Sequence, residues 1–187
     1  MKKFIIPLVF VVILAACATP PTEEMNRAHD AVIRARNDAD AVAYAPNILI
    51  RAEDALARMQ VEADAKRFDA ARNFASEAIS NAERAITEGR TGAGRARDEA
   101  TRLMDSLTGP LAETERAVNA SRGQPLLVDF NLLRNEMDLT RRTYDDARRD
   151  IQTANYADAI ARGQLVRSYL AAINSQLTGA AQAITRK

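Results

Sequence analysis

The chain has 187 residues, with 26 Lys and Arg against 25 Asp and Glu, and a formal net charge of +1. Without the first 16 residues, which hold Lys2 and Lys3, the count becomes 24 basic against 25 acidic residues. A chain this close to neutral lacks the overall attraction that nucleic acid exerts on basic proteins, so we expect no nucleic-acid partner. The 37 alanines, the 5% share of aromatic residues and the absence of tryptophan predict an all-α fold.

The scarcity of cysteine and histidine excludes several kinds of site. Cys17 is the sole cysteine and His29 the sole histidine. An internal disulfide and a metal site with several Cys or His ligands are therefore impossible. The Ser, Thr and Tyr residues have no plausible base beside them, so we predict no catalytic residue. We expect a protein that is not an enzyme and that holds no cofactor or metal, with His29 on the solvated surface.

The first seventeen residues have the pattern of an export signal. A basic start precedes an apolar run of eleven residues from Phe4 to Leu14, which is shorter than the roughly 20 residues of a membrane-spanning helix. The next residues, Leu14-Ala15-Ala16-Cys17, resemble the lipobox of bacterial lipoproteins. That resemblance implies cleavage of residues 1–16 as a signal peptide. It also implies a diacylglyceryl group on the Cys17 thiol and a further acyl chain, such as palmitate, on its amine. The alternative is an ordinary cleaved signal that leaves Cys17 as a free thiol.

Residues 17–21 are predicted to tether the folded part to a membrane. Five residues span at most about 17 Å, so the fold would begin close to the bilayer. Several acyl chains make such attachment practically permanent, whereas one holds a protein only marginally. Ala18 after the cysteine resembles the outer-membrane address of enteric lipoproteins. We therefore expect an outer-membrane, periplasm-facing protein, with the inner membrane as the alternative.

Between residues 22 and 88, small and apolar residues recur at the three- and four-residue spacing of a helix face. Thr22 is expected to cap the first helix, and Pro46 is expected to break it. The stripe then runs to about residue 63 and restarts in a shifted phase after Lys66-Arg67, up to residue 85. Such a phase shift over two or three residues predicts an antiparallel hairpin over residues 47–85.

Glycine and proline predict three breaks in the middle of the chain. The first is Gly89-Arg90-Thr91-Gly92-Ala93-Gly94, interpreted as a flexible connection; the second is Thr108-Gly109-Pro110; the third is Arg122-Gly123-Gln124-Pro125. We therefore expect a broken helical connector over residues 89–125, with short helices around 96–107 and 111–120.

A second hairpin is predicted over residues 126–187. Its first stripe runs from Leu126 to Ile151, reverses near Ala154-Asn155, and returns from Tyr156 to Leu177. At 1.5 Å per residue each arm is about 35–40 Å long. The two hairpins either pack as one bundle or form a short solenoid-like array.

The two hairpins align at a shift of 88 residues. This shift places Phe68 on Tyr156 and Ala71 on Ala159, so that in both hairpins an aromatic residue opens the return helix and an alanine follows three residues later. Heptad-patterned hairpins also align by chance, and duplication and coincidence both remain open at this point.

Part of the first hairpin has a recognisable pattern. The stretch Ala39–Pro46 (ADAVAYAP) and the alanine stripe that follows Arg67–Ala71 (RFDAA) resemble the bacterial envelope family called domain of unknown function 4398, over roughly residues 25–100. The resemblance implies a helical lipoprotein, or a helical segment beside a peptidoglycan-binding domain. It brings no catalytic residues, and it supports location and fold only.

The charged run over residues 141–150 is interpreted as a solvated helix face. Three pairs stand four residues apart: Arg141 and Asp145, Arg142 and Asp146, and Asp145 and Arg149. Each contributes about 0.2–0.5 kcal/mol to the stability of an exposed helix. Carboxylates flanked by arginines also have lowered pKa values, which is the reverse of what a general acid needs.

Phe74 and Tyr169 lie beside the apolar stripes, where they either widen the core or form an exposed patch for a partner. The predicted function is a membrane-anchored periplasmic lipoprotein that acts as a structural or adaptor protein and binds other envelope proteins through helical faces. The alternative is a carrier that holds a small or lipid-like ligand between the hairpins, in a dry pocket of about 300 Å³ or more. The oligomeric state is left open.

Overall fold

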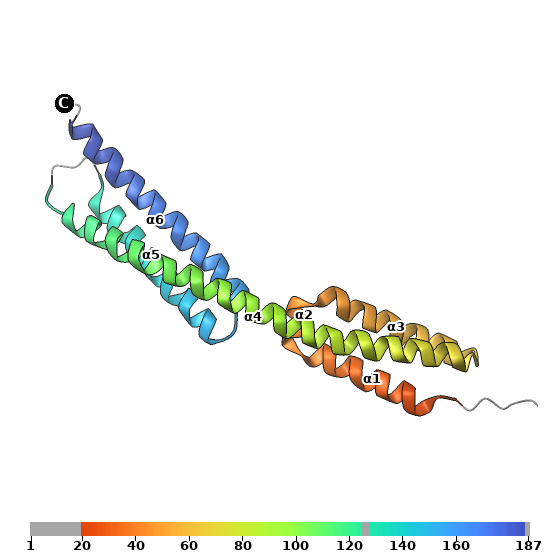
Figure 1. The fold of residues 1–187 in the computed structure, drawn as a ribbon. Coiled ribbons are helices and arrows are strands. Elements are labelled where there is room, and N and C mark those ends of the chain that lie inside the picture. Colours follow the sequence, from red (N-terminus) through yellow and green to blue (C-terminus); the bar gives the residue numbers. More distant parts are fainter. Residues whose placement is uncertain (1–19, 125–127, 186–187) are drawn as a thin grey trace, which may run out of the picture. The chain divides into compact units, whose positions relative to one another are not determined.

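The computed structural model describes residues 20–124 and 128–185 (Figure 1). It contains six helices and, within these residues, no strand, which confirms the predicted all-α fold. The helices are α1 (Thr22–Asn37), α2 (Ala39–Tyr44), α3 (Pro46–Asp64), α4 (Phe68–Ala120), α5 (Phe130–Gln152) and α6 (Tyr156–Thr185). The chain divides into two compact units, with the boundary between Ile86 and Thr87 inside α4. We call them unit 1 and unit 2.

Unit 1 packs α1, α2, α3 and the first part of α4 around a core made mostly of alanine (Figure 1). Its fully buried alanines follow the three- and four-residue spacing of the stripes, as in Ala71, Ala75, Ala78, Ala82 and Ala85 of α4. Alanine has the highest helix propensity, and its small side chain lets neighbouring helices approach closely. The sequence thus gives strong helices and a thin core.

The first helix of unit 1 differs from the prediction. Its N-cap is Pro21, which supplies no side-chain acceptor, so the predicted Thr22 cap is wrong. The helix also ends earlier, because Asp38 takes an extended conformation and its carboxylate accepts a 2.9 Å hydrogen bond from the backbone N–H of Ala41. This Asp38 cap begins α2. The predicted break at Pro46 is confirmed, since α3 begins at that residue.

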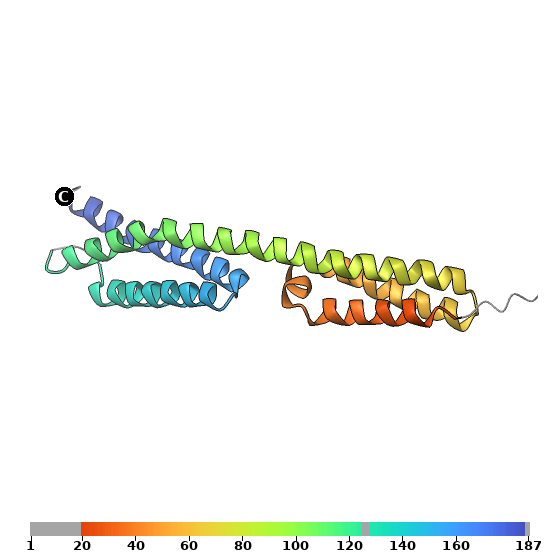
Figure 2. The same ribbon diagram turned by 60° about the horizontal axis from the view of Figure 1, so that its bottom comes forward.

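Unit 2 packs the later part of α4 against the antiparallel pair α5 and α6 (Figure 2). Its core uses larger side chains than that of unit 1, including Leu133, Met137, Val166, Leu170 and Ile173. Asp129 caps α5 by accepting backbone hydrogen bonds from Asn131 and Leu132 at 2.9 and 3.1 Å. The predicted second hairpin is confirmed over α5 and α6, while the predicted start at Leu126 lies outside the described residues.

Two polar contacts and one glycine hold α4 against the hairpin of unit 2. The Tyr144 hydroxyl lies 2.8 Å from Thr108 Oγ1, and Asn174 Nδ2 donates to Thr114 Oγ1 at 2.9 Å. At Gly163 an added Cβ would lie 2.7 Å from Leu103 Cδ2, so only glycine fits there without a shift of the leucine. This glycine therefore permits the close approach of α6 to α4.

The predicted breaks at Gly89–Gly94 and at Thr108-Gly109-Pro110 are wrong, because α4 continues through both. Each glycine costs a helix about 1 kcal/mol relative to alanine, and an internal proline about 3 kcal/mol. Around Pro110 that cost is offset by packing: Leu107 and Leu111 are 3% and 7% exposed, while Gly109 and Pro110 face solvent. The broken connector predicted over 89–125 is thus continuous helix as far as Ala120.

The turn of each hairpin has the same geometry at the 88-residue shift. Lys66 and Ala154 both have positive φ, 57° and 61°. The backbone N–H of Arg67 donates to Glu62 O at 2.9 Å, and that of Asn155 donates to Asp150 O at 2.8 Å. Both are the long-range bond of a Schellman-type helix end.

The burial pattern also repeats at this shift. The equivalent fully or almost fully buried pairs, with the unit 1 residue first, are Ala52 and Thr140, Ala71 and Ala159, Ala78 and Val166, Ala82 and Leu170, and Ala85 and Ile173. The two units therefore share one local architecture in the turn and along the buried stripe. Helices commonly end in this way, so the shared turn does not decide between duplication and coincidence.

Candidate interaction surface

The structure places the predicted site residues in three different situations. Leu14, Ala15, Ala16 and Cys17, the predicted lipid-attachment motif, lie outside the described residues. Phe74 is half-buried and packs against the core of unit 1, with the Arg58 guanidinium 5.9 Å from the centre of its ring. Phe74 thus widens the core and carries a cation on its outer side. His29 is exposed on α1.

Tyr169 lines a groove on unit 2. The groove has a volume of about 230 Å³ and is lined by Glu136 and Leu139 of α5 and by Tyr169, Ala172 and Ile173 of α6. Most of its lining is apolar. Leu139 is 48% exposed, and two further leucines at helical spacing on the same side, Leu132 and Leu165, are 51% and 47% exposed.

These residues belong to one face of the hairpin, which we call the outer face. It comprises Leu132, Glu136, Leu139, Thr143, Asp146 and Asp150 of α5 and Asp158, Arg162, Leu165, Tyr169, Ala172 and Gln176 of α6. Contacts between α5 and α6 show that the residues of the two helices share this face. Gln176 Nε2 donates to Glu136 Oε2 at 3.0 Å, and Arg162 Nη1 lies 3.2 Å from Asp150 Oδ2. The contacts with α4, such as Arg141 Nη1 to Glu115 Oε2 at 2.7 Å, lie on the opposite side.

The outer face is divided into an apolar part and an acidic end. Leu132, Leu139, Leu165, Tyr169 and Ala172 form the apolar part. Toward the turn between α5 and α6, Asp146 and Asp150 both approach Arg162, whose Nη1 lies 4.0 Å from Asp146 Oδ2. Asp158 stands one helical turn before Arg162. With Glu136 included, the face holds four carboxylates against Arg162, and Arg149 of the same helix as Asp146 pairs with that carboxylate, which leaves a formal charge of −2.

The equivalent face of unit 1 is polar at the positions of Leu139, Leu165, Tyr169 and Ala172, but it carries Ile48 and Phe74 where unit 2 has Glu136 and Arg162. The equivalent pairs, with the unit 2 residue first, are Leu139 and Arg51, Leu165 and Glu77, Tyr169 and Asn81, and Ala172 and Arg84. Where Asp146 and Arg162 pair in unit 2, unit 1 places Arg58 over Phe74. The hairpin architecture that the two units share therefore does not require apolar residues at these positions.

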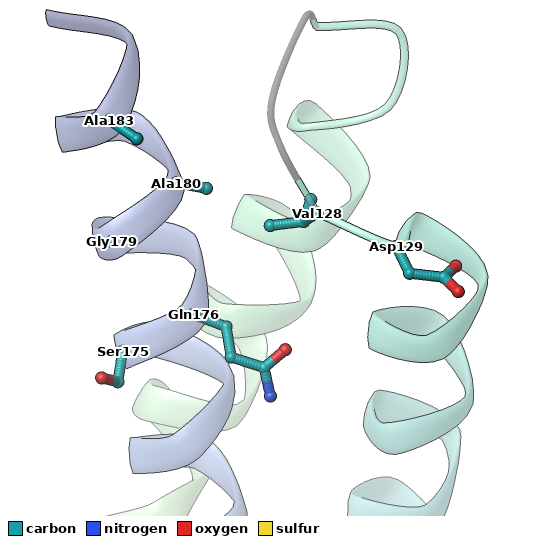
Figure 3. Close-up of a pocket in the computed structure, with 7 residues that line it drawn as sticks. All are labelled: Val128, Asp129, Ser175, Gln176, Gly179, Ala180 and Ala183. Carbon is teal, nitrogen blue, oxygen red and sulfur yellow. The ribbon is translucent and has the colours of Figure 1, made fainter.

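A second groove lies at the other end of the α5–α6 pair, where Val128 and Ala180 point toward each other (Figure 3). Its volume is about 390 Å³, and it is open to solvent. The lining includes Ser175, Gln176 and the Asp129 cap. Because the Asp129 carboxylate already accepts the first N–H groups of α5, it is committed to holding that helix.

The charged run on α5 pairs differently from the prediction. Arg141 contacts Glu115 of α4, Arg142 donates to the Asp138 carbonyl at 3.3 Å, and Asp146 contacts Arg149 and Arg162. These pairs are exposed, as predicted. Their partners differ, however: Glu115 and Arg162 belong to other helices, and Arg149 stands three residues from Asp146 rather than four. Spacing along one helix cannot show the pairs with Glu115 and Arg162, because these residues lie on other helices.

Glu62 and Arg67 form an ion pair across the turn between α3 and α4. The Arg67 guanidinium donates to both carboxylate oxygens of Glu62, one of them at 2.9 Å. This hydrogen bond lowers the pKa of the Glu62 carboxyl from its ordinary value of 4.5, and reciprocally raises the pKa of Arg67. The pair helps to hold the turn together from its solvent side.

Neither a metal centre nor a membrane span is found within the described residues. In residues 20–124 and 128–185, no three His, Cys, Asp or Glu side chains gather in a way that could hold a metal ion. Among the described helices, none is both long enough and apolar enough to cross a bilayer.

Residues 23–101 match the family described as Domain of unknown function (DUF4398). The matched segment begins at the second residue of α1 and ends within α4, so it includes α2 and α3 and is less than half of the chain. The resemblance stated above for roughly residues 25–100 is thereby confirmed. No curated protein and no solved structure matches the chain.

Proposed function

We propose that this protein is a lipid-anchored helical adaptor of the bacterial cell envelope. In this proposal Cys17 carries the acyl chains, residues 17–21 form the tether, and the helical units face the periplasm and bind other envelope proteins. The lipobox-like Leu14-Ala15-Ala16-Cys17 supports the anchor, and Ala18 supports the outer membrane as its location. The family match over residues 23–101 supports the helical part.

The observation that carries the adaptor role is the exposure of large apolar side chains on the helices of both units. Ile50 and Val61 of α3 are 52% and 61% exposed, and Leu132, Leu139 and Leu165 of unit 2 are about half exposed. Ile50 and Val61 are eleven residues apart and thus share one helix face. Apolar groups at this spacing are what a partner helix packs against.

The carrier alternative finds less support at the grooves of unit 2. The apolar groove beside Tyr169 is smaller than the roughly 300 Å³ that small-molecule sites usually need, and the groove of Figure 3 is larger but open to solvent and partly polar. Both grooves are better suited to a side chain of a protein partner than to an enclosed ligand.

The anchor is tested by Cys17→Ser in the natural host. We expect the variant to leave the membrane fraction, and mass spectrometry of the wild-type protein to detect three acyl chains at Cys17. A variant that stays with the membranes, or an unmodified Cys17 in the mature wild-type protein, would contradict the anchor. The adaptor role is tested by photoreactive side chains placed at Ile50, Val61 and Leu132. We expect at least one to capture an envelope protein in living cells.

A further inference from the structure

We propose that the outer face of unit 2 is the docking site for a basic amphipathic helix of a protein partner. This inference rests on the proposed adaptor function and gives it a location and a partner chemistry. The starting observation is the difference between two equivalent surfaces. At positions where unit 1 carries Arg51, Glu77 and Asn81, unit 2 carries Leu139, Leu165 and Tyr169.

The fold itself does not account for these apolar residues. Leu139 and Leu165 are about half exposed, so much of their apolar surface remains in water. Exposed apolar surface favours association, and Arg51, Glu77 and Asn81 of unit 1 show that the same hairpin forms with polar residues at these positions. The apolar part of the outer face thus has a use other than holding unit 2 together.

The spacing of the apolar residues fits a helix as the occupant. Leu132 and Leu139 are two turns apart on α5, and Leu165, Tyr169 and Ala172 follow one another at four and three residues on α6. The groove between the rows has a floor at Ile173 and a volume of about 230 Å³. One or two large apolar side chains of a helix fill such a groove, and the helix would complete a four-helix bundle with α4, α5 and α6.

The charge of the outer face selects a basic partner. Four carboxylates, Glu136, Asp146, Asp150 and Asp158, lie on this face against Arg162, and Arg149 of α5 also pairs with Asp146, so the group keeps a net charge of −2. Asp150 Oδ2 is a buried atom without a hydrogen bond in the described structure, although Arg162 lies 3.2 Å away. Lys or Arg residues of a docked helix would meet this acidic end, whereas an anionic lipid surface or an acidic helix would be repelled.

Photo-crosslinking in living cells tests the proposal on the full chain. A benzophenone side chain replaces Tyr169, and the matched control carries it at the equivalent Asn81 of unit 1. We expect the probe at 169 to capture a partner whose crosslinked peptide, sequenced by mass spectrometry, has apolar residues every three to four positions and a net positive charge. We expect the probe at 81 to capture that peptide at most weakly.

Two sets of variants sharpen the test. Leu139→Arg, which introduces the residue of unit 1, should reduce the crosslink at 169 by about tenfold or more. Asp146→Asn with Asp158→Asn should also reduce it, and the reduction should shrink at high salt. Val61→Arg, the same change at an exposed apolar site of unit 1, should leave it unchanged. Circular dichroism and melting curves verify that each variant folds.

Several outcomes would overturn the proposal. These are a crosslink at 169 to a second copy of this chain, to lipid or to an acidic segment, an unchanged yield in Leu139→Arg, and no crosslink at all. If one of these outcomes occurs while probes at Ile50 or Val61 capture envelope proteins, the docking site on unit 2 is wrong and the adaptor function stands. If no exposed position of either unit captures a protein, the adaptor function fails as well.

Discussion

Unit 1 and unit 2 share a hairpin turn and a burial pattern at an 88-residue shift, but they differ in what fills the core and in what covers the outside. Unit 1 buries alanine at positions where unit 2 buries Val166, Leu170 and Ile173. On the outside, unit 1 has Arg51 and Asn81 where unit 2 has Leu139 and Tyr169. The comparison separates the residues that the architecture needs from those it merely tolerates.

The largest expected effect comes from a charge in the unit 2 core. Leu133 is 0% exposed and lies in the apolar core of unit 2. An aspartate in its place would bury a carboxylate among apolar side chains, so Leu133→Asp should unfold unit 2 at a cost above about 4 kcal/mol. The neighbouring Leu132→Asp is the control, because Leu132 is 51% exposed and should tolerate the change. Helix content by circular dichroism distinguishes them. Equal stability of both variants would contradict the assignment of the core.

Exchange of equivalent core residues should destabilise both units for opposite reasons. Ile173→Ala removes packing from unit 2 and should cost about 2–5 kcal/mol. Ala85→Ile forces a large side chain into the thin core of unit 1 and should cost about 1–3 kcal/mol. Urea unfolding of each variant measures both changes. If Ala85→Ile instead raised the free energy of unfolding, the core of unit 1 around Ala85 would not be closely packed.

Gly163 tests how closely α6 approaches α4 in unit 2. An alanine Cβ there would lie 2.7 Å from the Leu103 Cδ2 methyl, so the leucine must shift, and Gly163→Ala should lower stability by about 1–2 kcal/mol. Gly179 on the same helix has open space around it, so Gly179→Ala should raise stability by up to about 1 kcal/mol. A higher melting temperature for Gly163→Ala than for Gly179→Ala would contradict the close approach of α6 to α4 at Gly163.

The smallest effect concerns the turn of unit 1. Because Arg67 lowers the pKa of Glu62 below 4.5, the ionised carboxylate stabilises the folded state at pH values above the unfolded pKa. That contribution is lost as the pH falls through the lowered folded pKa. Glu62→Gln should therefore slightly lower the melting temperature at neutral pH and should have no effect at strongly acidic pH. Glu77→Gln, on the exposed surface of α4, serves as the control.

The sequence predicted the helices well where periodic apolar residues define a face. The turns at Lys66 and Ala154, the start of α3 at Pro46 and the pairing of α5 with α6 all followed from spacing and phase. It failed where local propensity and packing disagree. Gly89–Gly94 and Pro110 are locally unfavourable, yet α4 continues through both. At Pro110, the packing of the neighbouring Leu107 and Leu111 outweighs propensity.

The candidate site was predictable only in part. The position of Tyr169 beside the apolar stripe marks it as a candidate, and in the structure it lines an apolar groove. Leu139 and Leu165 were missed, although the 88-residue shift places them on Arg51 and Glu77 and so contained the signal. The ion pair of Arg162 with Asp150 was missed because it joins two helices, and spacing on one helix cannot show which residues face each other across a hairpin.

The melting temperature of the double variant Leu139→Arg, Tyr169→Asn tests the central claim most directly, because both changes install the residues of unit 1. If the apolar outer face of unit 2 exists for a partner, the full chain should melt within about 2 °C of the wild-type protein. A fall of about 5 °C or more would show that these side chains hold unit 2 together, and the outer face would then be part of its core.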